Sequence, residues 1–138
     1  MKQCSLLILL CAFALTACSS TPSASEAEAV LRSKIEKQSK GLIKLVNFTK
    51  TNAQDAELMG VKVHAIEYQA EIEFAEDCYW GTPFGEGFEA IKGEPGPLNA
   101  WMYTGKKKGR KGERETITGT LRFQKTEKGW KGEDGKIY

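Results

Sequence analysis

Hydrophobic residues in the first half of the chain follow a helical spacing and then change to alternation. The helical part begins after residue 25, and its apolar positions are Ala27, Val30, Leu31 and Ile35. Residues three and four apart share one face of a helix, so these four form a stripe. Ser25 and Glu28 fit a capping box at the start, and Gly41 stands where a left-handed residue would end the helix. We expect a helix over residues 26–40, with a stripe that a sheet must cover.

After this helix the spacing predicts strands. Residues 42–48 are rich in β formers, and residues 51–60 read as a polar connector containing a turn. Residues 61–74 alternate apolar residues with glutamate and glutamine, as in a strand with one wet face. The first two valines of that strand have the opposite phase, so we expect a bulge or bend near residues 64–65.

The second half predicts shorter strands. Residues 81–97 are rich in glycine and proline and indicate an irregular segment or short strands, and residues 98–104 predict a further strand. Residues 116–124 alternate again, and a turn at 125–129 leads into a closing hairpin at Trp130. The predicted fold is an α+β domain, with one N-terminal helix packed on an antiparallel sheet of four or five strands.

The N-terminus has the composition of an export signal. Lys2 is followed by an apolar run over residues 6–15, which is shorter than the ~20 residues that a membrane-spanning helix needs. No basic patch follows it as a stop-transfer signal. We therefore expect residues 1–17 to be removed. They are either an ordinary signal peptide that a cysteine follows by chance or the signal peptide of a lipoprotein.

The sequence Leu15-Thr16-Ala17-Cys18 resembles the lipobox of bacterial lipoproteins. The resemblance implies that Cys18 carries lipid such as palmitate and becomes the first mature residue. Because a single acyl chain binds a bilayer only marginally, the several chains of this class of protein are needed for a stable anchor. Ser19 in place of Asp resembles the pattern sorted to the outer membrane, facing the periplasm, where the host has two membranes.

The chain therefore divides into a signal peptide at 1–17, a lipidated cysteine with a small, polar tether at 18–24, and one α+β domain at 25–138. The leader removes two of the four cysteines and lipid uses Cys18, which leaves Cys78 as a lone thiol. Cys78 is a candidate nucleophile or a site of pairing with a partner, but we expect a small buried hydrophobe.

The order of elements resembles that of cystatin-like and nuclear-transport-factor-2-like small domains of exported bacterial lipoproteins. The helix ending at Gly41, the long strand at 61–74 and the terminal hairpin carry the resemblance. It implies a helix-on-sheet fold and assigns no catalytic residue, because such domains include both ligand binders and interaction modules.

Charge is nearly balanced overall but unevenly distributed. The chain has 20 basic and 18 acidic residues, a formal net charge of +2, which argues against a nucleic-acid partner. A basic segment at 106–114 contains Lys106, Lys107, Lys108, Arg110, Lys111 and Arg114. We expect a mobile loop or hairpin tip there, either simply solvated or in contact with anionic envelope material such as lipid headgroups. An acidic stretch precedes it and contains Glu67, Glu71, Glu73, Glu76 and Asp77.

Catalytic templates are not matched. The chain has one histidine and none of the common metal or nucleophile motifs, so we assign no catalytic residue, no metal and no cofactor. His64 is expected to be structural or solvent-facing. The glutamates of the predicted long strand have a spacing that suits a cation or acid–base work, but we expect solvation or cross-strand pairing with Arg122 and lysines.

Two functions remain open. The first is a non-catalytic, lipid-anchored binding module of the cell envelope that meets an envelope protein or an anionic component through its basic segment. The second is a small-ligand-binding or enzymatic domain with an aromatic pocket between helix and sheet. Core packing is the alternative role of the aromatic residues concerned, which are Tyr68, Tyr79, Trp80, Trp101 and Tyr103.

Overall fold

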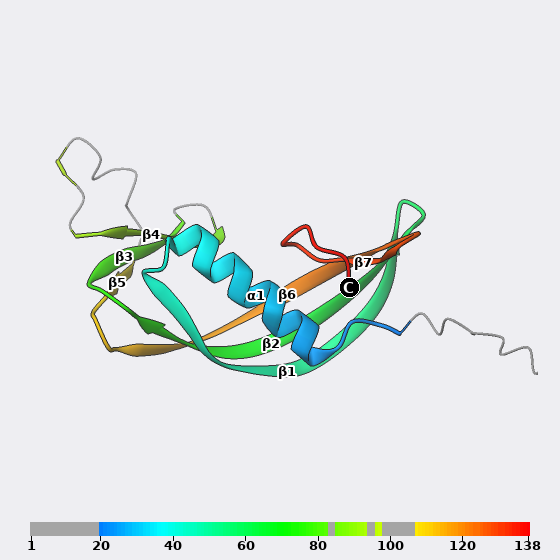
Figure 1. The fold of residues 1–138 in the computed structure, drawn as a ribbon, viewed down its shortest axis with the longest axis horizontal. Coiled ribbons are helices and arrows are strands. Elements are labelled where there is room, and N and C mark those ends of the chain that lie inside the picture. Colours follow the sequence, from blue (N-terminus) through cyan, green and yellow to red (C-terminus); the bar gives the residue numbers. More distant parts are fainter. Residues whose placement is uncertain (1–19, 83–84, 94–95, 98–106) are drawn as a thin grey trace, which may run out of the picture.

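A computed structural model describes residues 20–82, 85–93, 96–97 and 107–138. Within these residues the chain forms one helix and seven strands (Figure 1). In chain order they are α1 (Ala24–Ser39), β1 (Ile43–Leu58), β2 (Val61–Phe74), β3 (Cys78–Thr82), β4 (Gly85–Lys92), β5 (Lys107–Gly109), β6 (Arg114–Thr126) and β7 (Gly129–Lys131).

The strands form two antiparallel sheets, which two chain segments connect. The larger sheet has the order β1-β2-β6-β7 and the smaller one the order β4-β3-β5. β2 continues through a bend into β3, and β5 continues through a turn into β6, so the smaller sheet extends one end of the larger (Figure 1). Helix α1 lies across the concave side of the long, curved strands. The predicted α+β fold, with a helix on an antiparallel sheet, is confirmed.

The helix stripe fills the concavity. Ala27, Val30, Leu31 and Ile35 are fully buried, as the sequence predicts. They meet a sheet face whose fully or almost fully buried side chains are Ile66, Ile72, Leu121 and Phe123. At its C-terminal end α1 also reaches the smaller sheet, where the Gln38 side-chain oxygen accepts a hydrogen bond of 2.8 Å from the backbone N–H of Phe88. One helix therefore ties both sheets together.

The helix begins two residues earlier than expected. Ser23, not Ser25, is the N-cap and forms the capping box with Glu26. Both serines precede a glutamate by three residues, but Glu28 is engaged elsewhere, in an ion pair of 2.7 Å with Arg32 one turn further on. At the other end Gly41 adopts the expected left-handed conformation with φ of 82°.

Strand β1 is much longer than predicted. The expected connector at 51–60 is wrong, because β1 runs to Leu58 and stays paired with β2 along its whole length. The polar sequence suggested a loop, but it belongs to the edge strand of the sheet, where its side chains are largely exposed. A two-residue turn, Met59-Gly60, then closes the hairpin, so only the end of the predicted connector is a turn.

The bulge or bend expected near residues 64–65 of β2 is wrong, because the irregularities lie on β1. β2 has the expected bounds and pairs with β6 without interruption through residues 63–73. The irregularities fall instead on β1, between Leu45 and Asn47 and between Lys50 and Asn52. Each leaves one extra residue on the edge strand, which helps a long strand to follow the curvature around α1.

The remaining strand predictions have mixed outcomes. β6 and the closing hairpin with β7 lie where alternation placed them, and Leu121 and Phe123 face the core. Residues 81–92 contribute short strands, β4 and the end of β3. The strand expected at 98–104 lies outside the described residues.

A close contact joins β5 of the smaller sheet to β2 of the larger one. The backbone of Gly109 at the end of β5 lies against the ring of Phe74 at the end of β2, and a Cβ atom at position 109 would overlap that ring. Gly109 is buried although its neighbours on both sides are exposed. The close approach of β5 to the Phe74 ring therefore needs a residue without a side chain at position 109.

We predict that Gly109→Ala lowers the free energy of unfolding by about 1–3 kcal/mol, the usual cost of overpacking. Gly96→Ala is the matched control, because a Cβ there meets no atom within 4 Å. Urea titration of both variants measures the difference. If the cost at position 109 comes from the ring, it shrinks in a Phe74→Leu background; equal costs at positions 109 and 96 would contradict the contact.

Candidate functional site

Residues 107–109 of the basic segment form strand β5. β5 pairs with β3 so that Lys107 lies opposite Trp80 and Lys108 opposite Tyr79. The Lys107 ammonium is 5.3 Å from the centroid of the Trp80 ring, and the Lys108 ammonium is 5.9 Å from that of Tyr79. Both distances are within the range of a cation–π contact. Because successive side chains of a strand point to opposite faces, the two lysines place positive charge on both faces of the smaller sheet.

The turn after β5 is fastened to the end of β2. The Gly112 N–H donates to the carbonyl of Phe74 at 2.8 Å, and the Phe74 N–H donates to the carbonyl of Glu113 at 3.1 Å. The Lys111 N–H donates to the Asp77 carboxylate at 2.9 Å. Residues 107–109 therefore form a strand in place of the expected loop or hairpin tip, and backbone hydrogen bonds hold the turn that follows them.

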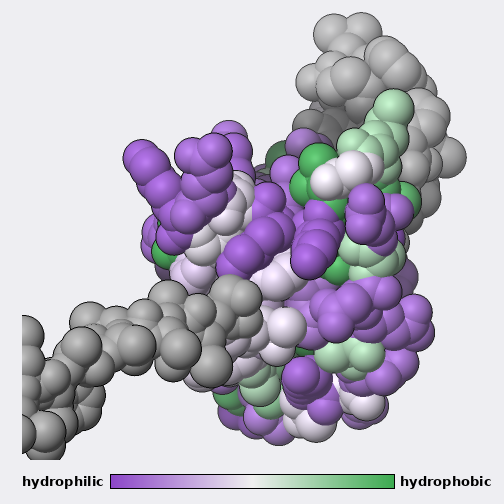
Figure 2. Space-filling model, turned by 90° about the vertical axis from the view of Figure 1, so that its right-hand side faces the viewer, coloured by the Kyte–Doolittle hydropathy of each residue, from purple (hydrophilic) through white to green (hydrophobic). Residues whose placement is uncertain are grey.

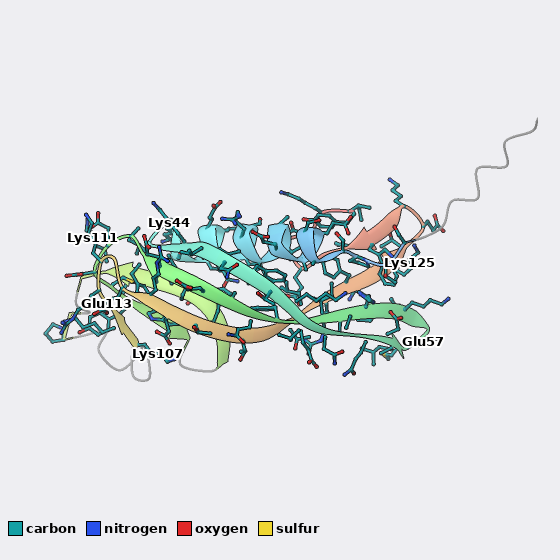
Figure 3. The ribbon with its side chains drawn as sticks, turned by 90° about the horizontal axis from the view of Figure 1, so that it is seen from below. Lys44, Glu57, Lys107, Lys111, Glu113 and Lys125 are labelled. Atoms are coloured by element: carbon teal, nitrogen blue, oxygen red, sulfur yellow. The ribbon has the colours of Figure 1, made fainter. Side chains whose placement is uncertain are left out.

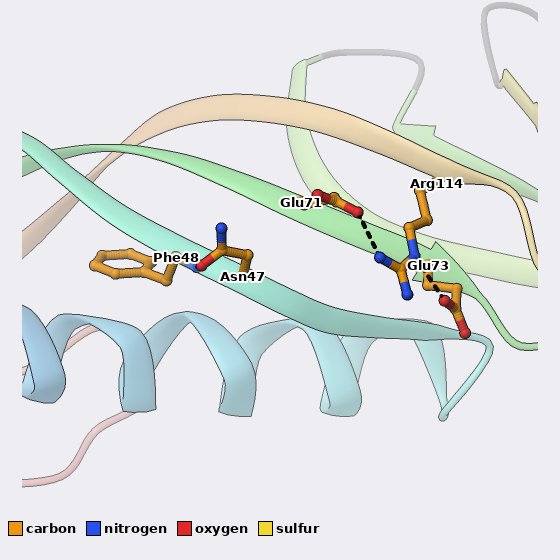
Figure 4. Close-up of polar contacts among 5 residues, drawn as sticks. All are labelled: Asn47, Phe48, Glu71, Glu73 and Arg114. Carbon is orange, nitrogen blue, oxygen red and sulfur yellow. Dashed lines mark hydrogen bonds and ion pairs between the residues drawn. The ribbon is translucent and has the colours of Figure 1, made fainter.

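Arg114 is neutralised by the acidic strand. Its guanidinium donates to Glu73 at 2.9 Å and to Glu71 at 3.0 Å (Figure 4). These hydrogen bonds, first that of Glu73, raise the pKa of Arg114 above its ordinary value, so its charge is permanent. The predicted partner Arg122 is wrong, since it lies opposite Ala65 at the other end of the strand pair. The charge of Arg114 is thus used in ion pairs within the protein and does not count toward the binding of a partner.

Three cations remain for a partner. Lys107 contacts Glu115 at 3.1 Å, whereas Lys108, Arg110 and Lys111 are exposed and form no ion pair within the part of the chain that the structure describes. Figure 3 shows Lys107 and Lys111 at one end of the elongated molecule, with Glu57 and Lys125 at the other. We call the group of Lys108, Arg110 and Lys111 the basic end.

A shallow hollow adjoins the basic end. Its volume is about 370 Å³, and its lining residues are Glu76, Asp77, Lys92, Gly93 and Lys111. Glu76 and Lys92 approach each other to 3.9 Å across it. Lys92 balances Glu76, and the Asp77 carboxylate accepts the backbone N–H of Lys111, so the hollow itself does not select an anion.

His64 has a structural position, as predicted. Its side chain is buried, and its Nδ1 is 2.7 Å from the Asp55 carboxylate on the neighbouring strand. The ring centroid lies 5.9 Å from that of Trp130. Among the described residues no group of three or more histidine, cysteine or acidic side chains has the arrangement of a metal site, and that includes the glutamates of β2.

The described aromatic residues fill the core and the sheet surface. Tyr68 is buried and stacks on Phe48 with centroids 5.6 Å apart, and Trp80 is buried against Phe74 at 5.7 Å. Tyr79 lies half-buried beneath Lys108. These three side chains thus have packing roles, the alternative role that the sequence left open for them.

Four of the predicted site residues lie outside the described part of the chain. They are the proposed lipidation site Cys18, Lys106 of the basic segment, and the aromatic residues Trp101 and Tyr103. No helix among the described residues is long and apolar enough to cross a membrane. Comparisons with protein-family models, with curated proteins and with solved structures found no match.

Sequence reasoning missed the partners of the basic segment. Tyr79 and Trp80 precede their lysines by almost thirty residues, and Glu71 and Glu73 precede Arg114 by about forty. No local pattern links such positions, because only the pairing of β3 with β5 and of β2 with β6 brings them together. The opposite charges of the two stretches are the one signal in the sequence.

Cys78, the one cysteine in the part of the chain that the structure describes, is buried at the start of β3, as predicted. Burial, and then the negative charge of Asp77, raise the pKa of the Cys78 thiol. The thiolate is the reactive form, so this environment opposes nucleophilic chemistry at neutral pH.

We predict that Cys78 in the folded protein reacts with a maleimide at pH 8 far more slowly than in urea. The thiol stays protonated and covered when folded, whereas unfolding exposes a thiol of ordinary pKa. Mass spectrometry of the Cys78 peptide measures the modification, with Cys78→Ala as the blank. Equal rates in the folded and unfolded protein would contradict a structural role.

Proposed function

We propose that this protein is a lipid-anchored binding module of the cell envelope, attached through Cys18 and binding an anionic envelope partner through its basic end. The lipobox-like sequence Leu15-Thr16-Ala17-Cys18 supports the anchor. Lys108, Arg110 and Lys111, which are exposed and have no ion pair with any described residue, support the binding role.

The observation that carries the proposal is the opposite placement of the two features. The carbonyl of Ser20, the first described residue, accepts a hydrogen bond of 3.0 Å from the Trp130 indole on β7. Helix α1 starts there and ends at the smaller sheet, where Gln38 bonds to β4. Its 16 residues alone span about 24 Å. The basic end thus lies far from the start of the described chain.

The predicted tether is also partly folded onto the domain. Pro22 is buried, Ser23 caps α1, and Ser20 is held by Trp130. Only Ser19 separates Cys18 from Ser20, and two residues reach at most about 7 Å. A lipid on Cys18 would therefore hold this end of the domain close to the bilayer and the basic end away from it. This favours an anionic partner in the envelope space over the headgroups of the anchoring membrane.

We predict that Cys18→Ala abolishes incorporation of fatty acid and leaves the precursor unprocessed. Labelling of cells with a radioactive or clickable fatty acid, followed by gel analysis of the purified protein, measures the effect. Cys78→Ala is the matched control and labels normally. Normal labelling of the Cys18→Ala variant would overturn the anchor.

We predict that replacing Lys108, Arg110 and Lys111 together by glutamine weakens capture of the anionic partner at low salt. The free energy of unfolding is expected to fall by no more than the ~0.5–1 kcal/mol of the exposed contact between Lys108 and Tyr79. Screening explains the salt dependence, because exposed charges act over about 10 Å at 0.1 M salt. Crosslinking in intact cells with mass spectrometry identifies the partner.

The control for this variant has the same net charge. Replacement of Lys50, Lys131 and Lys136 by glutamine removes three exposed lysines elsewhere, for which the described residues give no ion pair. Equal partner capture by both triple variants and the unaltered protein would remove the basic end from the proposal.

A further inference from the structure

The hairpin between β1 and β2 ends in a group of exposed apolar side chains. Leu58 is 60% exposed, Met59 is fully exposed and Val61 is 41% exposed. With Gly60 they form four consecutive residues, which we call the apolar tip. Single exposed hydrophobic residues are ordinary, but three together on a protruding turn mark a contact surface.

The turn holds Met59 in a conformation that its side chain does not favour. Leu58 and Val61 are paired across the hairpin, and the two residues between them have positive φ, 52° for Met59 and 79° for Gly60. Hairpins with this geometry prefer asparagine or aspartate at the first position. A residue with a long side chain at φ of 52° costs stability, so local folding does not explain a methionine here.

The apolar tip lies at the end where the described chain begins. Trp130 holds Ser20, the Trp130 ring is 5.9 Å from that of His64, and His64 contacts Asp55 at 2.7 Å. From these two paired residues β1 and β2 continue for only three residues each to the tip, about 10 Å. Figure 2 looks onto this end of the molecule and shows hydrophobic surface exposed among hydrophilic side chains.

We propose that the apolar tip inserts into the lipid surface that holds the acyl chains of Cys18. This inference rests on the anchor proposed above, because Cys18 lies within two residues of Ser20 and so reaches the same end of the domain. The lipid and the tip make two separate contacts with one bilayer. Together they fix the orientation of the domain, which a single flexible anchor does not.

The charges beside the tip favour an apolar contact. Glu57 and Lys62 lie directly opposite each other on the last paired positions before Leu58 and Val61. Glu127 and Lys128 form the neighbouring turn between β6 and β7. Positive and negative charges balance, so insertion depends on burial of apolar surface, with little dependence on salt or on anionic lipid.

The size of the apolar tip favours lipid over a protein partner. A stable protein interface buries about 1,200 Å² or more of surface in total, which three side chains on one turn do not supply. An acyl-anchored protein needs only a modest second contact to hold it on a bilayer.

A fluorescence experiment tests the contact. The lipidated protein carries Met59→Cys labelled with the environment-sensitive dye NBD and is reconstituted into phosphatidylcholine vesicles. We expect blue-shifted emission that brominated lipids quench and that is unchanged when phosphatidylglycerol is added. The matched control, Glu89→Cys, labels an exposed residue of β4 in the smaller sheet and is expected to report water.

The outcomes separate the two proposals. A protein that carries no fatty acid overturns the anchor and, with it, this inference. A lipidated protein whose label at position 59 reports water overturns the tip contact alone. A blue shift that brominated lipids do not quench and that grows with protein density assigns the tip to a second copy of the chain, and also overturns the lipid contact.

A second variant removes the apolar side chain without harming the fold. Met59→Asn suits the left-handed turn better, so the melting temperature is expected to stay the same or rise. Transfer of the lipidated protein between vesicles is expected to become roughly tenfold faster, a factor equivalent to about 1.4 kcal/mol. Glu89→Asn is the control and leaves transfer unchanged. An unchanged transfer rate for Met59→Asn would contradict the proposal.

Discussion

The burial of one helical stripe in a curved sheet is the interaction on which the other features depend. Ala27, Val30, Leu31 and Ile35 have no exposed surface, and the long strands β1, β2 and β6 curve around them. Because the helix runs along the molecule, it separates the end that holds Ser20 from the end that holds the smaller sheet. The distance between the proposed anchor and the basic end is therefore a consequence of how the core is filled.

Elements with a local pattern could be predicted, and features that depend on distant residues could not. The stripe of α1, the bounds of β2 and the hairpin of β6 and β7 follow from spacing alone. The length of β1 does not, because its second half, residues 51–58, is an exposed edge and lacks the alternation by which strands are recognised. The N-cap was misplaced for another reason: two serines satisfy the same rule, and the ion pair between Glu28 and Arg32 favours the earlier.

The sequence-based prediction of the candidate site differs from the structure more than the prediction of the fold does. The sequence shows an acidic stretch and a basic stretch of opposite charge. It does not show that the pairing of β2 with β6 brings Glu71 and Glu73 against Arg114. Arg114 of the basic stretch and these two glutamates neutralise one another, and Lys108, Arg110 and Lys111 are the basic side chains of that stretch for which the described residues give no ion pair. Net charge along a segment therefore overestimates what a partner meets, because it ignores pairing that the fold creates.

The continuity of β2 with β3 and of β5 with β6 has a mechanical consequence. A pull between the bilayer and a partner held at the basic end would run along these strands. The hydrogen bonds that join β2 to β6 lie across that direction, so they would be loaded in shear and many would have to break together. Helix α1 directly follows the proposed anchor, so it receives the load first and passes part of it to β4 through the Gln38 contact. Under such a pull the paired strands would therefore resist as one unit.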